Sequence, residues 1–216
     1  MLSLQNNRLS AISPKIGYCK ELRALYLQSN PLQSLPVSIG ALPVLSDLSF
    51  DIVESMTVPP PEIGAAGHQA SIEWLRVYYH NIVVNFLTML RSYFLNPQAA
   101  FNFFDVEGNA DRSGLLRADG NLDKHEIARA LEFMKVNMRF FDYLWITLDV
   151  DNNGHVELWE FVKNWNSSTG VRLIEPHVAL KPFLQSDVIS KTADLLWANP
   201  WTTSASECLP APELLD

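Results

Sequence analysis

Hydrophobic positions repeat with a fixed period of 23 residues along the first third of the chain, residues 1–67. The first copy contains Leu2, Leu4, Asn7, Leu9, Ile12, Ile16 and Gly17. Their counterparts in the second copy, each 23 residues later, are Leu25, Leu27, Asn30, Leu32, Leu35, Ile39 and Gly40. Self-similarity at one period is typical of stacked repeats, in which each copy buries its apolar face against the next. The pattern therefore predicts a short repeat array.

This array is expected to end near residue 67. A third copy begins at Leu48 and Phe50, but Val53 stands where the other two copies have asparagine. The sequence VPPPEIGAAG follows at 58–67, and its prolines can continue neither a strand ladder nor a helix. Two and a half copies are fewer than the roughly three that a stable array needs. We therefore expect either an N-terminally truncated array, which we favour, or an exposed edge that another chain covers.

Residues 68–95 show a helical pattern, because apolar side chains recur there at steps of three and four. These side chains are Ile72, Leu75, Tyr79, Ile82, Phe86, Leu90 and Tyr93. The stripe is wide, so we expect the helix to pack on the last repeat on one side and on the next module on the other. Within it, residues 77–90 carry no Asp, Glu, Lys or Arg, but these 14 residues are fewer than the roughly 20 that a membrane span needs. The pattern predicts a buried helix and no membrane span.

Oxygen-bearing side chains gather in DVDNNGHVELWE, residues 149–160, which lies between two segments with helical apolar stripes. The stretch fits D-x-[DN]-x-[DN]-G-x5-E from end to end. A hard cation such as Ca²⁺ takes six to eight oxygen ligands, and a 12-residue loop can supply them. Gly154 allows a sharp turn at positive φ, where a side chain would collide. The alternative is an acidic turn between two helices that binds no metal.

This helix–loop–helix segment resembles the EF-hand calcium-binding family. The resemblance implies calcium ligands at Asp149, Asp151 and Asn153 through side chains, at the His155 carbonyl, at Glu157 directly or through water, and at Glu160 through both oxygens. It also implies that Val156 points inward and pairs with a partner loop. The ring of His155 is expected to face solvent.

A partner loop is half present in the preceding segment. Its back half, DGNLDKHE at 119–126, matches the later loop positions and places Leu122 opposite Val156, but Leu115 and Arg117 occupy its first ligand positions and cannot serve as carboxylate ligands. We expect an insertion within residues 106–118 that separates a first ligand at Asp105 from the back half of the loop. The candidate second metal site comprises Asp105, Asp119, Asn121, Asp123 and Glu126, with Glu107 or Asn109 as an early ligand. Two interpretations stay open, a weakened calcium site and a pairing partner that binds no metal.

The motif L-x-L-x-x-N-x-L-x-x-L-P-x-x-I-G of the first region resembles the leucine-rich repeat family. The resemblance implies a short strand at each L-x-L, a hydrogen-bond ladder from the asparagines, and a concave face lined by strand side chains. The side chains implied to line this face are Tyr26, Gln28, Asp47, Ser49 and Asp51, which we take as candidate partner-binding residues. Tyr26 is the best anchor among them, because aromatic residues are enriched at binding hot spots.

These patterns together predict a mostly α protein in four parts. They are a leucine-rich repeat (β/loop solenoid) fragment at 1–67, a linker or packing helix at 68–95, an EF-hand pair forming an α lobe at 96–170, and a C-terminal tail at 171–216. One short helix is expected in the tail, within 186–201. It is expected either to pack on the long helix or to lie in the groove of the EF-hand lobe as a built-in target.

Composition narrows the choice of partners and compartment. The net charge of -8 and the pI near 5.1 argue against nucleic acid and anionic membranes, and fit cations or basic peptides better. Cys19 and Cys208 are too few for a disulfide framework, and the N-terminus shows no secretory signal, so we expect a cytoplasmic protein. The chain contains no G-x-S-x-G, P-loop, H-E-x-x-H or kinase motif, so we expect no enzymatic activity.

The sequence thus leads to two hypotheses about function. In the first, the chain is a calcium-binding regulatory or adaptor protein, with Ca²⁺ in the 149–160 loop and an unknown protein partner on the repeat face or in the groove of the EF-hand lobe. In the second, it is a structural scaffold whose EF-hand lobe holds Ca²⁺ constitutively or not at all.

Overall fold

The chain forms two compact units, as seen in a computed structural model that describes residues 1–108, 120–167 and 172–197. The first unit combines Met1–Asn81 with the described residues from Leu173 onward, and the second lies within Ile82–Arg172. Helices predominate, with one small parallel sheet in the first unit and one two-stranded sheet in the second. The predicted mostly α class is therefore confirmed. The predicted insertion at 106–118 falls largely outside the described residues.

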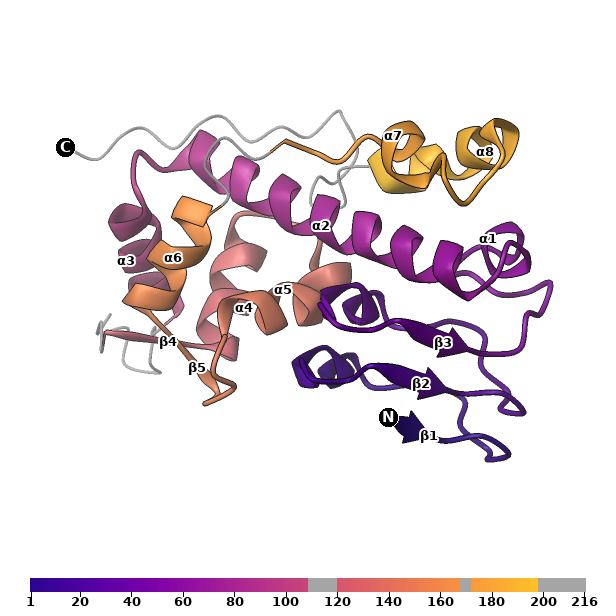
Figure 1. Ribbon diagram of the computed structural model, residues 1–216. Helices are drawn as coiled ribbons and strands as arrows, with labels where there is room; N and C mark the ends of the chain where they lie inside the picture. The colour runs from indigo at the N-terminus through magenta and orange to yellow at the C-terminus, as the bar shows by residue number, and fades with distance from the viewer. Residues whose placement is uncertain (109–119, 168–171, 198–216) are drawn as a thin grey trace. The chain divides into compact units, whose positions relative to one another are not determined.

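The first unit begins with three short parallel strands, β1 (Leu2–Ser3), β2 (Ala24–Tyr26) and β3 (Asp47–Ser49), which lie side by side (Figure 1). Leu2 pairs with Leu25 and Leu25 pairs with Leu48, so the sheet register equals the 23-residue period of the sequence. Two 3-10 helices, η1 (Pro14–Tyr18) and η2 (Val37–Ala41), follow β1 and β2 at the same interval. The first two copies thus each contain one strand and one short 3-10 helix.

Leucine side chains and one asparagine hold the copies together. Leu25, Leu27 and Leu48 are at most 1% exposed, so stacking of the copies buries their apolar stripe. The side-chain amide of Asn30 donates to the carbonyls of Leu4 and Leu27, both at 2.9 Å, and its oxygen accepts from Leu9 N at 3.0 Å. A buried asparagine therefore satisfies backbone groups of two successive copies, which a valine at the equivalent position 53 cannot do.

The array ends against helices α1 (Pro61–Ala65) and α2 (His68–Tyr93). Pro61 lies in the first turn of α1, where its missing N–H costs nothing. The first half of α2 packs on the repeats so closely that a Cβ at Gly40 would lie 2.1 Å from the carbonyl oxygen of Leu75. Arg76 and Gln69 also donate to carbonyls of the preceding loop, at Leu45 and Ser46. The expected packing of the long helix on the last repeat is present.

Two C-terminal helices, α7 (Pro176–Leu180) and α8 (Ser186–Trp197), belong to the first unit. Asn81 of α2, which is 1% exposed, donates to the carbonyls of Ile174 and Leu196 and accepts from Ile174 N. The C-terminal helix is therefore fastened to the long helix, which is one of the two placements expected for it. The side chains of Leu195 and Trp197 lie outside the described residues.

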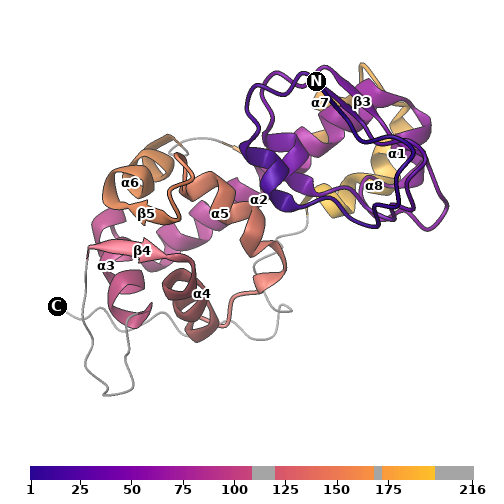
Figure 2. The same cartoon turned by 90° about the horizontal axis from the view of Figure 1, so that it is seen from below.

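The second unit contains two helix–strand–helix segments around one core. Helix α3 (Pro97–Gly108) precedes β4 (Asn121–Asp123) and α4 (Lys124–Phe133), and a short 3-10 helix, η3 (Met138–Phe140), leads into α5 (Phe141–Leu148), β5 (His155–Glu157) and α6 (Leu158–Ser167). Strands β4 and β5 run antiparallel at the side of these helices (Figure 2). Leu122 and Val156 pair across them and are both fully buried. The predicted pairing of these two residues is confirmed.

Aromatic rings fill the core of the second unit. Phe101 and Phe104 of α3 meet Phe161 of α6 edge-on, with ring centroids 5.9 and 6.0 Å apart. Arg91, near the end of α2, donates to the carbonyl of Trp165 and lies over its ring. No helix in the described parts of the chain is both long enough and apolar enough to cross a membrane.

Candidate metal centre

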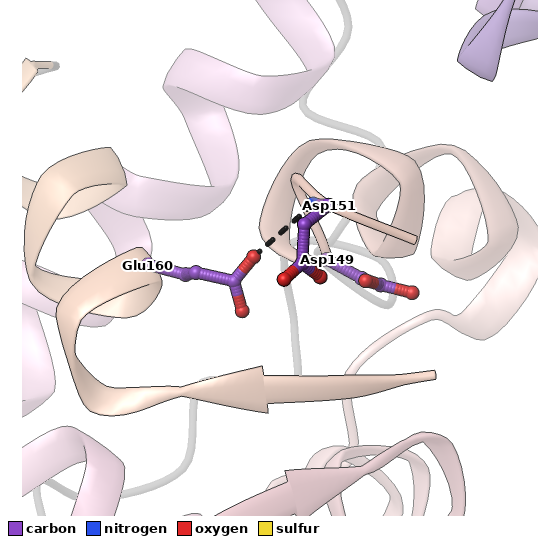
Figure 3. Close-up of side chains that lie close together, drawn as sticks. All are labelled: Asp149, Asp151 and Glu160. Carbon is purple, nitrogen blue, oxygen red and sulfur yellow. Dashed lines mark hydrogen bonds between the residues drawn. The ribbon is translucent and has the colours of Figure 1, made fainter. Parts of the chain in front are cut away.

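Three carboxylates converge at the loop between α5 and α6. Asp149 follows the last residue of α5, Asp151 lies in the loop, and Glu160 stands in the first turn of α6. One oxygen from each lies within 4.8 Å of the other two (Figure 3). Because the loop turns back on itself between Asp151 and Glu160, residues eleven positions apart face a common point.

Two of these carboxylates are fully buried. Asp149 and Glu160 are 0% exposed, whereas Asp151 is exposed. Burial of a carboxylate in its charged form costs several kcal/mol unless hydrogen bonds or an opposite charge compensate for the loss of water. The site therefore depends on the groups that the loop presents to these oxygens.

Backbone N–H groups supply much of this compensation. Glu160 Oε1 accepts from the amides of Val150 at 2.8 Å and Asp151 at 3.4 Å, and Glu160 Oε2 accepts from Glu157 N at 3.0 Å. Asp149 accepts from the amides of Asn153 and Gly154, at 3.1 and 3.3 Å. These amide donors are neutral dipoles, so they orient the carboxylates without cancelling their formal charges. A cation at the centre of the group would remove the repulsion between them.

The backbone of the loop has the turn that the sequence required. Gly154 has a φ of +90° and Asn152 a φ of +57°, so the chain reverses through two left-handed residues. The Asn153 side chain closes the turn locally, because its oxygen accepts from His155 N at 2.8 Å and its amide donates to Asp151 at 3.1 Å. Two of the predicted ligands are thus tied to each other.

The remaining predicted residues of the loop are His155, expected to bind through its backbone carbonyl, and Glu157. His155 is exposed and forms part of β5, opposite Asp123. The carboxylate of Glu157 accepts a hydrogen bond from the indole of Trp159, which is 50% exposed. Neither side chain belongs to the group formed by Asp149, Asp151 and Glu160.

Two supporting side chains were not singled out from the sequence as part of the site. The buried indole of Trp145 donates to Asp149 Oδ2 at 3.1 Å, and its spacing of four residues from Asp149 on a helix could have indicated this contact. Asn164 donates to the carbonyls of Thr147 and Glu160, both at 3.0 Å. Asn164 therefore joins α6 to the end of α5. No local sequence pattern predicts this contact, because it links two separate helices.

The first loop repeats part of this geometry. Asp105 is 3% exposed and accepts from Gly120 N at 3.0 Å, as Asp149 accepts from Gly154 N, and Gly120 has a φ of +87°. Glu126 is 5% exposed and accepts from Asp123 N at 2.6 Å, as Glu160 accepts from Glu157 N.

The other predicted ligands of the first loop do not complete such a group. Asn121 is exposed, and Asp123 caps α4 by accepting from the amides of His125 and Glu126. Asp119 and Asn109 lie outside the described residues, as does the side chain of Glu107. Within the part of the chain that the structure describes, the group at Asp149 is the one place where three such side chains meet.

The predicted partner-binding residues form hydrogen-bonded rows across the strands of the first unit. Tyr26 donates to Asp47 Oδ2 at 2.7 Å, which raises the pKa of Tyr26, and Gln28 accepts from Gln5 and donates to Ser49. Asp51 accepts from Ser29 N at 2.5 Å. Tyr26, Gln28, Asp47 and Ser49 are half-buried and Asp51 is exposed, so all five remain partly accessible.

Comparison with known proteins finds no matching family model, no matching curated protein and no matching solved structure. Carboxylates are hard oxygen donors, which suit Ca²⁺, Mg²⁺ or Mn²⁺ rather than the softer metals that thiolates and imidazoles select. A compact, partly buried group of three carboxylates on a preformed loop can hold one such cation.

Proposed function

We propose that this chain is a calcium-binding adaptor protein, in which residues 149–160 form an EF-hand loop and the N-terminal copies form a leucine-rich repeat surface for a protein partner. The observation that carries the proposal is the convergence of Asp149, Asp151 and Glu160 within 4.8 Å. The complete D-x-[DN]-x-[DN]-G-x5-E pattern supports it, because three of the residues that the pattern requires are those that converge.

Calcium fits the donor set better than other common cations. The group contains carboxylates alone, and zinc sites are built mainly from cysteine and histidine. Mg²⁺ demands near-ideal octahedral geometry and keeps several waters, whereas Ca²⁺ tolerates six to eight oxygens in a flexible loop. Asp149, Asp151 and Glu160 would hold the ion together with Asn153 and the His155 carbonyl, and Glu157 would contribute through water.

Pairing of the two loops supports an EF-hand lobe. Leu122 and Val156 join the loops through β4 and β5. Asp105 accepts from Gly120 N and Glu126 from Asp123 N, as Asp149 accepts from Gly154 N and Glu160 from Glu157 N. The first loop therefore stabilises the second whether or not it holds a metal. The lobe would also serve in the alternative function, a scaffold that holds calcium permanently or not at all.

Calorimetric titration of the purified chain with calcium tests the metal site. We expect at least one site with a Kd on the order of 10⁻⁷ to 10⁻⁵ M. Glu160→Gln should weaken that site by about 100-fold or more, because an amide supplies one oxygen where the carboxylate supplies two. Glu132→Gln is the matched control, since Glu132 is exposed in the same unit and its removal takes away one charge outside the loop.

Unchanged affinity in Glu160→Gln, or an equal loss in Glu132→Gln, would contradict the assignment. Tryptophan emission recorded in the same titration reports on the loop, because Trp145 donates to Asp149 and Trp159 lies beside Glu157. Calcium-dependent exposure of apolar surface, measured with a hydrophobic dye, would favour the regulatory adaptor. Calcium-dependent stability without such exposure would favour the scaffold.

A further inference from the structure

A small cavity of about 230 Å³ lies in the first unit, at the point where the repeat array meets α1 and α2. Its walls come from β3 and the residues that follow it, and from the end of α1, the turn after it and the first residues of α2. The lining residues that matter below are Asp47, Ser49, Phe50, Ile52 and His68. The cavity is smaller than the roughly 300–1,000 Å³ of sites for drug-sized ligands. Its size therefore suits one amino-acid side chain of a partner rather than a free cofactor.

The polar part of this cavity favours a cation. Asp47 is the one residue among those lining it that carries a formal charge when histidine is neutral. Asp47 Oδ2 accepts from the Tyr26 hydroxyl at 2.7 Å, and Oδ1 accepts no hydrogen bond from the residues that the structure describes. The imidazole of His68 and the hydroxyl of Ser49 also line the cavity, and both side chains can accept a hydrogen bond. A bound donor group would find a carboxylate oxygen and neutral acceptors around it.

Hydrogen bonds across the strands keep Asp47 and Ser49 at the cavity in fixed positions. Gln5 donates to Gln28, and Gln28 donates to Ser49. Tyr26 holds Asp47 in the same way. Both rows run from the earlier strands toward β3, so the acceptors at the cavity are held in place before a partner arrives. Such preorganisation reduces the entropy lost on binding.

The apolar part of the cavity selects among cations. Phe50 is half-buried and Ile52 is 46% exposed, so both present apolar surface at the cavity. A guanidinium group is planar, more weakly hydrated than an ammonium group, and stacks on aromatic rings, while its methylene stem can cover an aliphatic side chain. These properties match an arginine side chain better than a lysine.

We propose that this cavity is the anchor site for an arginine side chain of a basic partner segment that docks on the repeat face. The inference deepens the adaptor half of the proposed function and rests on it. The attraction for a basic segment comes from Asp47, the one carboxylate that lines the cavity, and it would be strongest at low ionic strength. Asp47 binds the guanidinium, Phe50 stacks on it, and Ser49 and His68 complete the ring of acceptors.

The test is a titration of the ¹⁵N-labelled full chain with the peptide acetyl-Gly-Ser-Arg-Ser-Gly-amide, followed by amide chemical shifts. Two companion peptides carry citrulline or lysine in place of arginine. Citrulline keeps the shape of arginine without its charge. We expect saturable shifts at Asp47, Ser49 and His68 with a Kd on the order of 1 mM, which corresponds to a single anchoring residue. The lysine peptide should bind several-fold more weakly, and the citrulline peptide should produce no saturable shift.

Two variants and one control make the test specific. Asp47→Asn retains an acceptor for Tyr26 and should weaken the arginine peptide about tenfold, because it removes the charge-assisted hydrogen bond. Phe50→Leu should reduce the preference for arginine over lysine without abolishing binding. Glu54→Gln removes an exposed carboxylate that does not line the cavity and should leave affinity unchanged.

Equal binding of the citrulline and arginine peptides, or unchanged affinity in Asp47→Asn, would overturn the proposal. Equal or tighter binding of lysine would overturn the choice of arginine, as would saturable shifts that map away from the cavity. Failure here is distinguishable from failure of the calcium assignment, because Glu160→Gln affects the second unit and Asp47→Asn the first. If the chain binds calcium normally but does not bind the arginine peptide, the arginine-anchor proposal is wrong and the calcium assignment stands.

Discussion

Burial of Asp149 and Glu160 is the feature at the scale of single residues that says most about function. A carboxylate on a protein surface needs no explanation, but two with no exposed area in one loop require compensation. Neutral amides hold them in place, and a divalent cation supplies the missing positive charge in the proposed function. Trp145 adds a buried donor to Asp149, so the loop is partly ordered by residues outside it.

Replacement of Gly154 by alanine should cost both stability and calcium affinity. Its φ of +90° strains any residue with a Cβ, although no atom lies within 4 Å of the position that the Cβ would take. We expect a loss of about 1–2 kcal/mol in the unfolding free energy of the metal-free protein, and roughly tenfold weaker calcium binding. Chemical denaturation and calorimetry measure the two effects.

Gly67→Ala provides the matched control for this variant. Gly67 has a φ of +105°, and its Cβ would also meet no atom within 4 Å, but it lies between α1 and α2 in the first unit. The stability loss should be similar and calcium affinity unchanged. Equal weakening of calcium binding in both variants would mean that the effect of Gly154→Ala is general and not specific to the loop.

Helix α2 is the element that the two compact units share. Its first half packs on the repeats through the close approach at Gly40, and its second half reaches Trp165 through Arg91. Near its middle, Asn81 presents a buried amide to the C-terminal segment. A single buried polar side chain therefore satisfies three backbone groups of the C-terminal segment.

Asn81→Ala should destabilise the first unit by about 3 kcal/mol, because it leaves the amide and carbonyl of Ile174 and the carbonyl of Leu196 without their partner. Urea denaturation measures the loss, and limited proteolysis should show earlier cleavage within residues 173–197. Asn85→Ala is the control on the same helix, because Asn85 is only half-buried and its side chain bonds to none of the described residues. If Asn85→Ala changes the unfolding free energy by more than about 0.5 kcal/mol, the loss in Asn81→Ala would reflect a general effect on helix α2 and not the hydrogen bonds of the Asn81 amide.

At the scale of the whole molecule, the first unit is built from two stretches of chain that are separated in sequence by the second unit. The repeats and the first half of α2 precede the second unit, and α7 and α8 follow it. Each unit has its own buried apolar residues, such as Leu25 and Leu48 in the first and Phe104 and Phe161 in the second. Ligand binding to one unit can therefore change its stability separately from that of the other.

Calcium should raise the thermal unfolding temperature of the second unit and leave that of the first unit unchanged. A ligand present at 100 times its Kd stabilises by about 2.7 kcal/mol, which for a unit of this size corresponds to a shift on the order of 10–20 °C. Differential scanning calorimetry in calcium and in a chelator measures this shift, and Glu160→Gln should abolish it. A uniform shift of a single transition would show that the two units unfold together.

Several features of this protein could be derived from the sequence alone, because they depend on residues that are near one another along the chain. The 23-residue period determined the strand register, since each copy can bury its leucines only against the same positions of the next copy. The pattern D-x-[DN]-x-[DN]-G-x5-E likewise brought Asp149, Asp151 and Glu160 together, because a turn at Asn152 and Gly154 is enough to do so.

Other features were decided by the tertiary structure, because they join residues that local periodicity cannot relate. The hydrogen bond from the Asn81 amide to the Leu196 carbonyl joins residues 115 positions apart, and it helps to hold α8 in the first unit. The contacts of Asn164 and the cavity beside Asp47 likewise arise only where separate elements meet. Hydrophobic pattern thus determined which faces are buried, whereas the buried polar contacts determined which distant segments meet there.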